Sequence, residues 1–91
     1  MKLIASKAFT RDTKRFLKKN PQFAANVKTT LSLLEKDAFE PQLKTHKLKG
    51  RLKNSWACSV GYDLRIVFEI VEHENEDTIL LQTIGTHDEV Y

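Results

Sequence analysis

The spacing of apolar residues changes from a helical repeat to a two-residue repeat partway along the chain, and this change restricts the fold. Within residues 21–37, apolar side chains recur at intervals of four, four and three, which predicts an amphipathic helix. They are Phe23, Val27, Leu31 and Leu34. From Trp56 onward, apolar residues alternate with other residues, as they do along half-buried strands. Helices followed by strands are typical of an α+β domain whose helices pack on one face of an antiparallel sheet.

The first half of the chain is predicted to form one strand and two helices. A short strand is expected at residues 2–5, and Ser6 then suits the cap of a helix over residues 7–20. Pro21 cannot continue this helix, but proline is accepted in the first turn of a second helix, here residues 21–37. Two helices joined in this way form a helical hairpin.

The second half is predicted to form a connection and three strands. Residues 38–55 contain Pro41, Gly50 and many polar residues, so we expect a long ordered connection with a short strand near Lys47 and Leu48. The further strands are expected at residues 56–60, 64–71 and 78–87, with a turn at 61–63 and a charged turn, EHENED, at 72–77. The predicted fold is a small antiparallel sheet of about four strands, in the order β-α-α-β-β-β. The helical hairpin covers one face, and the other face is left for a ligand.

Size and cysteine usage indicate one domain in a reducing compartment. A chain of 91 residues can bury one hydrophobic core but not two, so residues 1–91 are expected to form a single domain. The N-terminus becomes charged before an apolar segment of signal or membrane length develops. Cys58 has no second cysteine to pair with, and its simplest interpretation is a small buried residue on a strand. We therefore expect a cytoplasmic protein with no membrane partner.

The charges are distributed unevenly along the chain. Residues 1–30 carry eight Lys or Arg and a single acid, Asp12, and residues 41–62 carry five Lys or Arg and no acid. Acidic residues gather instead between Glu69 and Asp77. A basic side of this kind suits a polyanion such as nucleic acid, although an ordinary solvated face is the alternative.

Several kinds of catalytic site are not supported by the residues present. The three glycines stand apart at positions 50, 61 and 85, so no glycine-rich phosphate loop is formed. The histidines, His46, His73 and His87, lack the close spacing of a metalloprotease helix, and His73 falls within the acidic turn. No serine lies in a nucleophile-turn signature. Neither a metal nor another cofactor is expected.

The remaining polar residues suit the handling of a phosphodiester. Cations for phosphates and an aromatic surface for stacking come from one basic segment, with His46 among them. Its members are Lys44, Lys47, Lys49, Arg51, Lys53 and Trp56. Arg65 is a single cation in an otherwise apolar strand and needs an anion or a partner. The alternatives are that Arg65 pairs with Glu69 on the same strand face or lies at a wet sheet surface.

His87 follows Gly85 and Thr86 at the end of the last expected strand. An imidazole can give or take a proton near neutral pH, as RNA cleavage by the substrate's own 2′-hydroxyl requires. His87 or His46 could transfer protons, and Tyr91 or Trp56 could position a base. A histidine at ordinary surface or in the core is the alternative.

Four segments, taken together and in order, resemble the RelE/ParE superfamily of bacterial toxins, and especially its YafQ-like branch. They are SKAFTRDTKRFLKKNP, LKTHKLKGRLKNSWACSV, DLRIVFEI and LLQTIGTHDEVY. The resemblance covers essentially the whole chain. It implies a small antiparallel sheet with two N-terminal helices packed against it. It also implies ribosome-dependent endonucleolytic cleavage of messenger RNA in the ribosomal A site, restrained by a cognate antitoxin protein.

The resemblance also implies roles for single residues. His46 matches a catalytic histidine of the YafQ-like branch, and Asp63 matches an acidic site residue. His87 matches the principal catalytic histidine, with Tyr91 at the position of a C-terminal aromatic. Arg65 matches the strand arginine that contacts the scissile phosphate in RelE and YoeB-like branches. We expect His87 to protonate the leaving 5′-oxygen, His46 or Asp63 to assist removal of the 2′-proton, and Tyr91 to orient a base.

The sequence departs from its relatives at two positions. Ser59 stands where YafQ-like proteins can have a further histidine, and Thr83 stands where many relatives have an arginine. Two other interpretations share the same fold: a ParE-like inhibitor of DNA gyrase, and a degenerate toxin that only binds. The combination of His46, His87 and Tyr91 favours the nuclease, because a gyrase inhibitor does not require it. The lysine-rich segment from Lys44 to Lys53 is then expected to contact ribosomal RNA and the message backbone.

Overall fold

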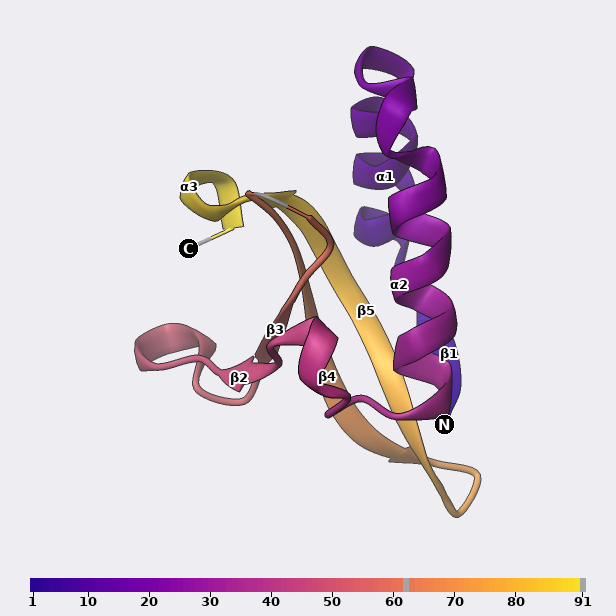
Figure 1. Ribbon diagram of the computed structural model, residues 1–91. Coiled ribbons are helices and arrows are strands. Elements are labelled where there is room, and N and C mark those ends of the chain that lie inside the picture. The colour runs from indigo at the N-terminus through magenta and orange to yellow at the C-terminus, as the bar shows by residue number, and fades with distance from the viewer. Residues whose placement is uncertain (62, 91) are drawn as a thin grey trace.

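A mixed β-sheet carries the helical hairpin on one face in the computed structural model, which describes residues 1–61 and 63–90 (Figure 1). Within these residues the sheet has five strands in the order β1-β5-β4-β3-β2. The strands are β1 (Lys2–Ala5), β2 (His46–Lys47), β3 (Trp56–Ser59), β4 (Leu64–His73) and β5 (Glu76–Thr86). The helices are α1 (Lys7–Lys19), α2 (Ala24–Lys36) and α3 (His87–Val90), with 3-10 turns η1 (Pro21–Phe23), η2 (Pro41–Leu43) and η3 (Gly50–Leu52).

The helical hairpin begins and turns at the predicted residues. Ser6 caps α1, because its Oγ accepts a hydrogen bond from the Phe9 N–H at 3.0 Å. The same hydroxyl donates to the Gln82 carbonyl at 3.1 Å, which ties the start of α1 to β5. Pro21 starts η1 rather than α2, so α2 begins at Ala24. The short strand expected near Lys47 is confirmed as β2.

The prediction of a purely antiparallel sheet of about four strands is wrong in one respect. The strands β2 to β5 form the expected antiparallel meander, but β1 is hydrogen-bonded alongside β5 in parallel, from Lys2 opposite Thr78 to Ala5 opposite Leu81. A parallel pair needs a long crossover connection, and here the helical hairpin and the other strands supply it. A four-residue apolar strand carries no signal for the direction of its partner.

The charged turn at 72–77 is shorter than predicted. Glu72 pairs with Asp77 and His73 pairs with Glu76, so both strands continue into the charged segment. Only two residues remain in the turn, with positive φ angles of 51° and 66°. Two consecutive left-handed residues match the tight turn that suits the twist of a hairpin. Because every charged side chain here is exposed, the strands can extend without burying charge.

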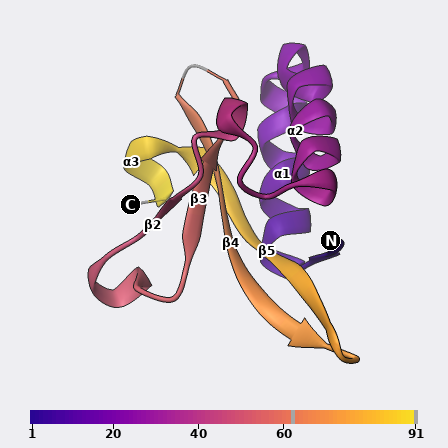
Figure 2. The same cartoon turned by 60° about the horizontal axis from the view of Figure 1, so that its bottom comes forward.

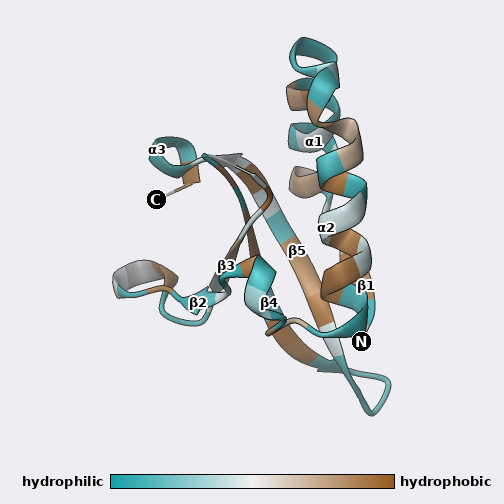
Figure 3. Cartoon of the chain, in the orientation of Figure 1, coloured by the Kyte–Doolittle hydropathy of each residue, from teal (hydrophilic) through white to brown (hydrophobic). Residues whose placement is uncertain are grey.

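The hydrophobic core lies between the helical hairpin and one face of the sheet. Its most buried members include Phe9, Val27, Leu34, Leu43, Cys58, Ile66, Phe68, Ile79 and Leu81. Figure 3 shows the apolar stretches along β4 and β5 and the hydrophilic tip of their hairpin. Cys58 is buried as expected, and this burial raises the pKa of its thiol to about 12. In the described part of the chain, no helix has the length and apolar character needed to cross a membrane.

Candidate active site

The sheet face turned away from α1 and α2 brings several predicted site residues together. We call it the open face and define it by Ser59, Arg65 and Gly85, which pair directly across β3, β4 and β5. Directly paired residues of neighbouring strands point to the same face. By the same rule His46, Ala57 and Val67 form the next row of this face. Figures 1 and 2 both place α3 and the β2 region on the side of the sheet away from the helical hairpin.

Arg65 is half-buried at the centre of the open face. Of its neighbours across the strands, Ser59 has a small side chain and Gly85 has none. Its Nη1 donates to the carbonyl of Leu64 at 3.2 Å. Among the described residues Arg65 forms no ion pair, so the expected alternative of a pair with Glu69 is not found. A guanidinium in this position can make paired hydrogen bonds to phosphate oxygens.

Gly85 allows α3 to lie directly on the open face. A Cβ atom at this position would be 3.1 Å from both Glu89 Cβ and Val90 Cγ1. The helix is also held from its start, because Glu89 Oε1 accepts a hydrogen bond from the Thr86 N–H at 2.8 Å. The sequence Thr-His-Asp-Glu therefore makes one half of a capping box. This local pattern, which sequence reasoning overlooked, makes His87 the first residue of a helix rather than the last residue of a strand.

His87 and Asp63 meet where β5 ends and β4 begins. The backbone N–H of His87 donates to the Asp63 carbonyl at 3.2 Å. The His87 side chain is 55% exposed, and its Nδ1 lies 3.6 Å from Asp88 Oδ1. Arg65 is two residues along from Asp63, which corresponds to about 7 Å of strand. The structure therefore gathers His87, Asp63 and Arg65 at one end of the open face.

His46 lies at the opposite side of the open face, on the edge strand β2. Its Nδ1 is 3.1 Å from the Lys44 carbonyl oxygen. Because a carbonyl only accepts, this hydrogen bond requires the proton on Nδ1, and the neutral ring then has its lone pair on Nε2. This is the form that a general base needs. Three strand spacings of about 4.8 Å separate β2 from β5, so the two histidines flank the face and do not touch.

The predicted basic segment is divided between the two sheet faces. Lys47 pairs with Trp56, and Trp56 pairs with Phe68 of the core, so both lie on the face that bears the helices. The side chains of Lys44, Lys49 and Lys53 are exposed in the connection. Tyr91 lies outside the described residues, as does the side chain of Arg51.

The sequence matches, over residues 1–91, the model of a family described as bacterial toxin of type II toxin-antitoxin system, YafQ. The chain belongs to this family. It is 30% identical to a metal-bound toxin from Helicobacter pylori, covering 100% of this chain and 99% of that chain, with a TM-score of 0.71. The structure of YafQ from E. coli strain BL21(DE3) has a TM-score of 0.80 to this chain, with 18% sequence identity, covering 98% of this chain and 96% of that chain. YafQ in an E. coli DinJ-YafQ complex has a TM-score of 0.77, with 19% sequence identity and the same coverage of the two chains. The search of curated proteins finds no match.

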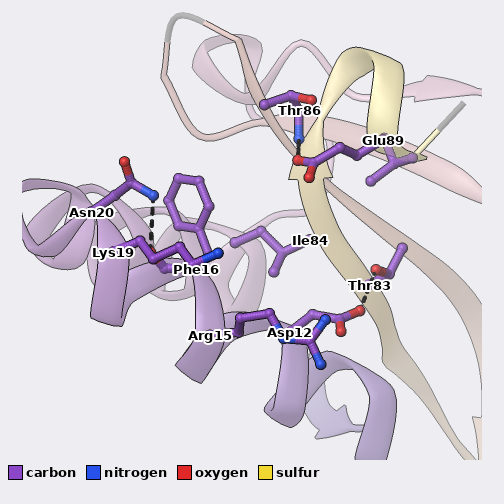
Figure 4. A pocket seen from close by; sticks show the side chains of 10 residues that line it. Asp12, Arg15, Phe16, Lys19, Asn20, Thr83, Ile84, Thr86 and Glu89 are labelled. Atoms are coloured by element: carbon purple, nitrogen blue, oxygen red, sulfur yellow. Dashed lines mark hydrogen bonds between the residues drawn. The ribbon is translucent and has the colours of Figure 1, made fainter.

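In this YafQ-family toxin a cavity of about 640 Å³, which the sequence did not predict, lies between α1 and the end of β5 (Figure 4). Asp12, Arg15 and Lys19 of α1 face Thr83, Thr86 and Glu89 across it. The Thr83 hydroxyl donates to Asp12 Oδ2 at 2.9 Å, and this hydrogen bond, with a smaller effect of Arg11, holds the pKa of the Asp12 carboxyl below its usual value. The Thr83 hydroxyl of this YafQ-family chain is thus directed at α1.

The basic side of α1 was also missing from the predicted site. Six Lys or Arg side chains of this helix are exposed: Lys7, Arg11, Lys14, Arg15, Lys18 and Lys19. The excess of Lys and Arg in residues 1–30 is visible in the sequence, but the sequence does not state where these side chains lie relative to the histidines.

Proposed function

We propose that this YafQ-family toxin is a ribosome-dependent endoribonuclease that cleaves messenger RNA during translation. The observation that carries the proposal is the gathering of His87, Asp63 and Arg65 at one end of the open face, with His46 across from them. These are the groups needed to cleave RNA by attack of its own 2′-hydroxyl: proton donors and acceptors, and a cation for the phosphate.

The arrangement favours His46 over Asp63 as the general base. The 2′-oxygen attacks phosphorus while the bond to the 5′-oxygen breaks on the opposite side, so base and acid belong on opposite sides of the phosphate. Asp63 adjoins His87, whereas His46 faces it from β2. His46 Nε2 then takes the 2′-proton, and protonated His87 gives its proton to the leaving 5′-oxygen. Arg65 binds the nonbridging oxygens, and the products are a 2′,3′-cyclic phosphate and a 5′-hydroxyl.

The proposed reaction needs no metal-activated water, because the substrate provides the nucleophile. A metal-activated water would instead leave an ordinary phosphate monoester at one new end. The chemistry of the RNA ends therefore distinguishes the two routes.

We further infer that a cognate antitoxin restrains the toxin in the cytoplasm, where translated messages are found. E. coli YafQ forms a complex with DinJ. The basic surface of this chain suits an acidic antitoxin segment that orders as it wraps the toxin. The exposed cations of α1 and of the Lys44–Lys53 segment suit ribosomal RNA as well.

The test compares His87→Ala with His73→Ala, the same change at a histidine on the distant hairpin tip. Message ends are mapped with purified ribosomes, and ribosome binding is measured by co-sedimentation. We expect His87→Ala to bind ribosomes but to lose cleavage, and His73→Ala to cleave as the wild type does. Cleavage by His87→Ala at the wild-type rate would refute the assignment. The wild-type toxin is also induced in bacteria. Growth arrest with intact messages and altered DNA supercoiling would indicate a gyrase inhibitor, and absence of growth arrest would indicate a degenerate toxin.

A further inference from the structure

An aromatic and cationic cluster lies on the sheet face opposite the proposed active site. Phe39, between α2 and η2, is 49% exposed, and only Met1 joins it among the exposed large apolar side chains of the described residues. Its ring meets Trp56 edge-to-face, with centroids 5.1 Å apart and planes at 82°. Lys47 Nζ lies 5.8 Å from the centroid of the Trp56 ring. We call Phe39, Lys47 and Trp56 the aromatic patch.

The exposure of the aromatic patch is not required by the core. Trp56 packs partly against the core, so burial accounts for one side of its ring. Phe39 covers Trp56 only edge-on while leaving about half of its own surface in water, which is an unfavourable place for a large apolar ring. A partner that stacks on Phe39 would remove this surface from water.

The charges around the aromatic patch suit a polyanion. The two nearest acids in sequence, Asp37 and Glu40, both accept backbone hydrogen bonds: Asp37 Oδ1 from the Phe39 N–H at 2.9 Å, and Glu40 Oε2 from the Gln42 N–H at 2.7 Å. Their carboxylates are therefore directed at their own turns. Lys47 provides a cation beside Trp56, and residues 41–62, which include it, contain no acid. Aromatic rings beside cations are the means by which proteins bind single-stranded nucleic acid.

The edge strand β2 connects the aromatic patch to the open face. His46 and Lys47 are neighbours on β2 and point to opposite faces of the sheet. Since β2 is the last strand of the sheet, an RNA strand that passes His46 can turn around this edge and reach Lys47. We propose that the aromatic patch is a subsite for an unpaired base of the same RNA strand that the toxin cleaves. In naming that strand the proposal rests on the proposed function.

Trp56 makes the subsite directly observable, because it is the single tryptophan of the chain. The whole toxin is titrated with a single-stranded oligonucleotide whose 2′-hydroxyls are methylated, so that it binds but is not cleaved. We expect the RNA to quench Trp56 fluorescence. Phe39→Ala should weaken binding about 5- to 150-fold, the range of 1–3 kcal/mol for one stacked base. Phe39→Tyr keeps the ring and should bind as the wild type does, and thermal melting verifies that both variants are folded.

The result also separates the subsite from the proposed nuclease. His87→Ala should retain the quenching, because it lies on the other face. Quenching by a wild-type toxin that cuts no message would preserve the subsite and refute the nuclease. Cleavage that is lost in His87→Ala, without any quenching, would do the reverse. Equal RNA affinity for Phe39→Ala and the wild type overturns the subsite. So does a Phe39→Ala variant that loses affinity only for purified antitoxin, since the patch would then be a protein-docking surface.

Discussion

Gly85→Ala tests whether the packing of α3 on the sheet positions His87 for catalysis. The added Cβ would lie 3.1 Å from Glu89 Cβ and Val90 Cγ1, and 3.2 Å from Glu89 Oε1. Carbon atoms in ordinary contact are at least about 3.5 Å apart, so α3 must move by roughly 0.4 Å or more. The φ angle of Gly85 is not in the left-handed region, so the effect of the substitution is steric and does not come from backbone strain.

The expected effect on catalysis is larger than the effect on stability. Overpacking costs about 1–3 kcal/mol, and a four-residue helix at the surface can move, which favours the lower end. One kcal/mol lowers the Tm of a domain of this size by about 4–8 °C. A misplacement approaching 1 Å can reduce a reaction rate about 100-fold, so we expect a loss of about 10- to 100-fold in message cleavage.

Gly61→Ala is the matched control. A Cβ there would meet Asn26 Nδ2 at 3.6 Å and Phe23 Cε1 at 4.0 Å, which are ordinary contacts. Both changes restrict the unfolded chain in the same way, so their difference isolates the contact with α3. Cleavage is measured in single turnover on programmed ribosomes, together with Tm. If folded Gly85→Ala cleaves within about twofold of Gly61→Ala, the position of α3 does not control His87 and the reasoning fails.

Two further predictions follow from the shifted pKa values. Cys58 is fully buried with its pKa raised to about 12, so a thiol reagent at pH 8 should modify it only after unfolding; reaction in the native state at the unfolded rate would contradict this. The pKa of Asp12 is lowered from 3.8, chiefly by the Thr83 hydrogen bond, so this contact stabilises the fold above pH 3.8 and its contribution is lost as the pH falls through the lowered pKa. Thr83→Val should therefore lower the free energy of unfolding at pH 7 by at most about 1 kcal/mol, and lower the Tm with it. Calorimetry should show that the difference in Tm between the variant and the wild type becomes smaller in acid. An undiminished difference would argue against the linkage.

Most of the fold could be predicted because its signals are local. The helical repeat of α2, the Ser6 cap and the two-residue alternation of β3 and β4 are each determined within a few residues. The parallel pairing of β1 with β5 joins residues more than seventy positions apart, and nothing in the sequence of either strand states the direction of that pairing. The length of the turn between β4 and β5 was overestimated, because the charged residues were expected to lie outside the strands. Exposed ends of strands accept charged residues.

The candidate site was predictable in its residue types but not in its faces. Alternation places Trp56 on the same strand face as Cys58, but it does not state which face the helices cover. The sequence therefore could not separate Trp56 from the residues on the face of His46. Phe39 was overlooked because a single aromatic residue in a connection looks like core. Its exposure appears only when the packing of Trp56 is known.

The parallel pair of β1 and β5 has a consequence for synthesis on the ribosome. Within the described residues the only sheet partner of β1 is β5, which begins at Glu76 and is followed by α3. A nascent chain lacking these segments has neither the partner of β1 nor the helix that carries His87. During synthesis β1 therefore has no partner strand until β5 has emerged, so the sheet cannot close before then.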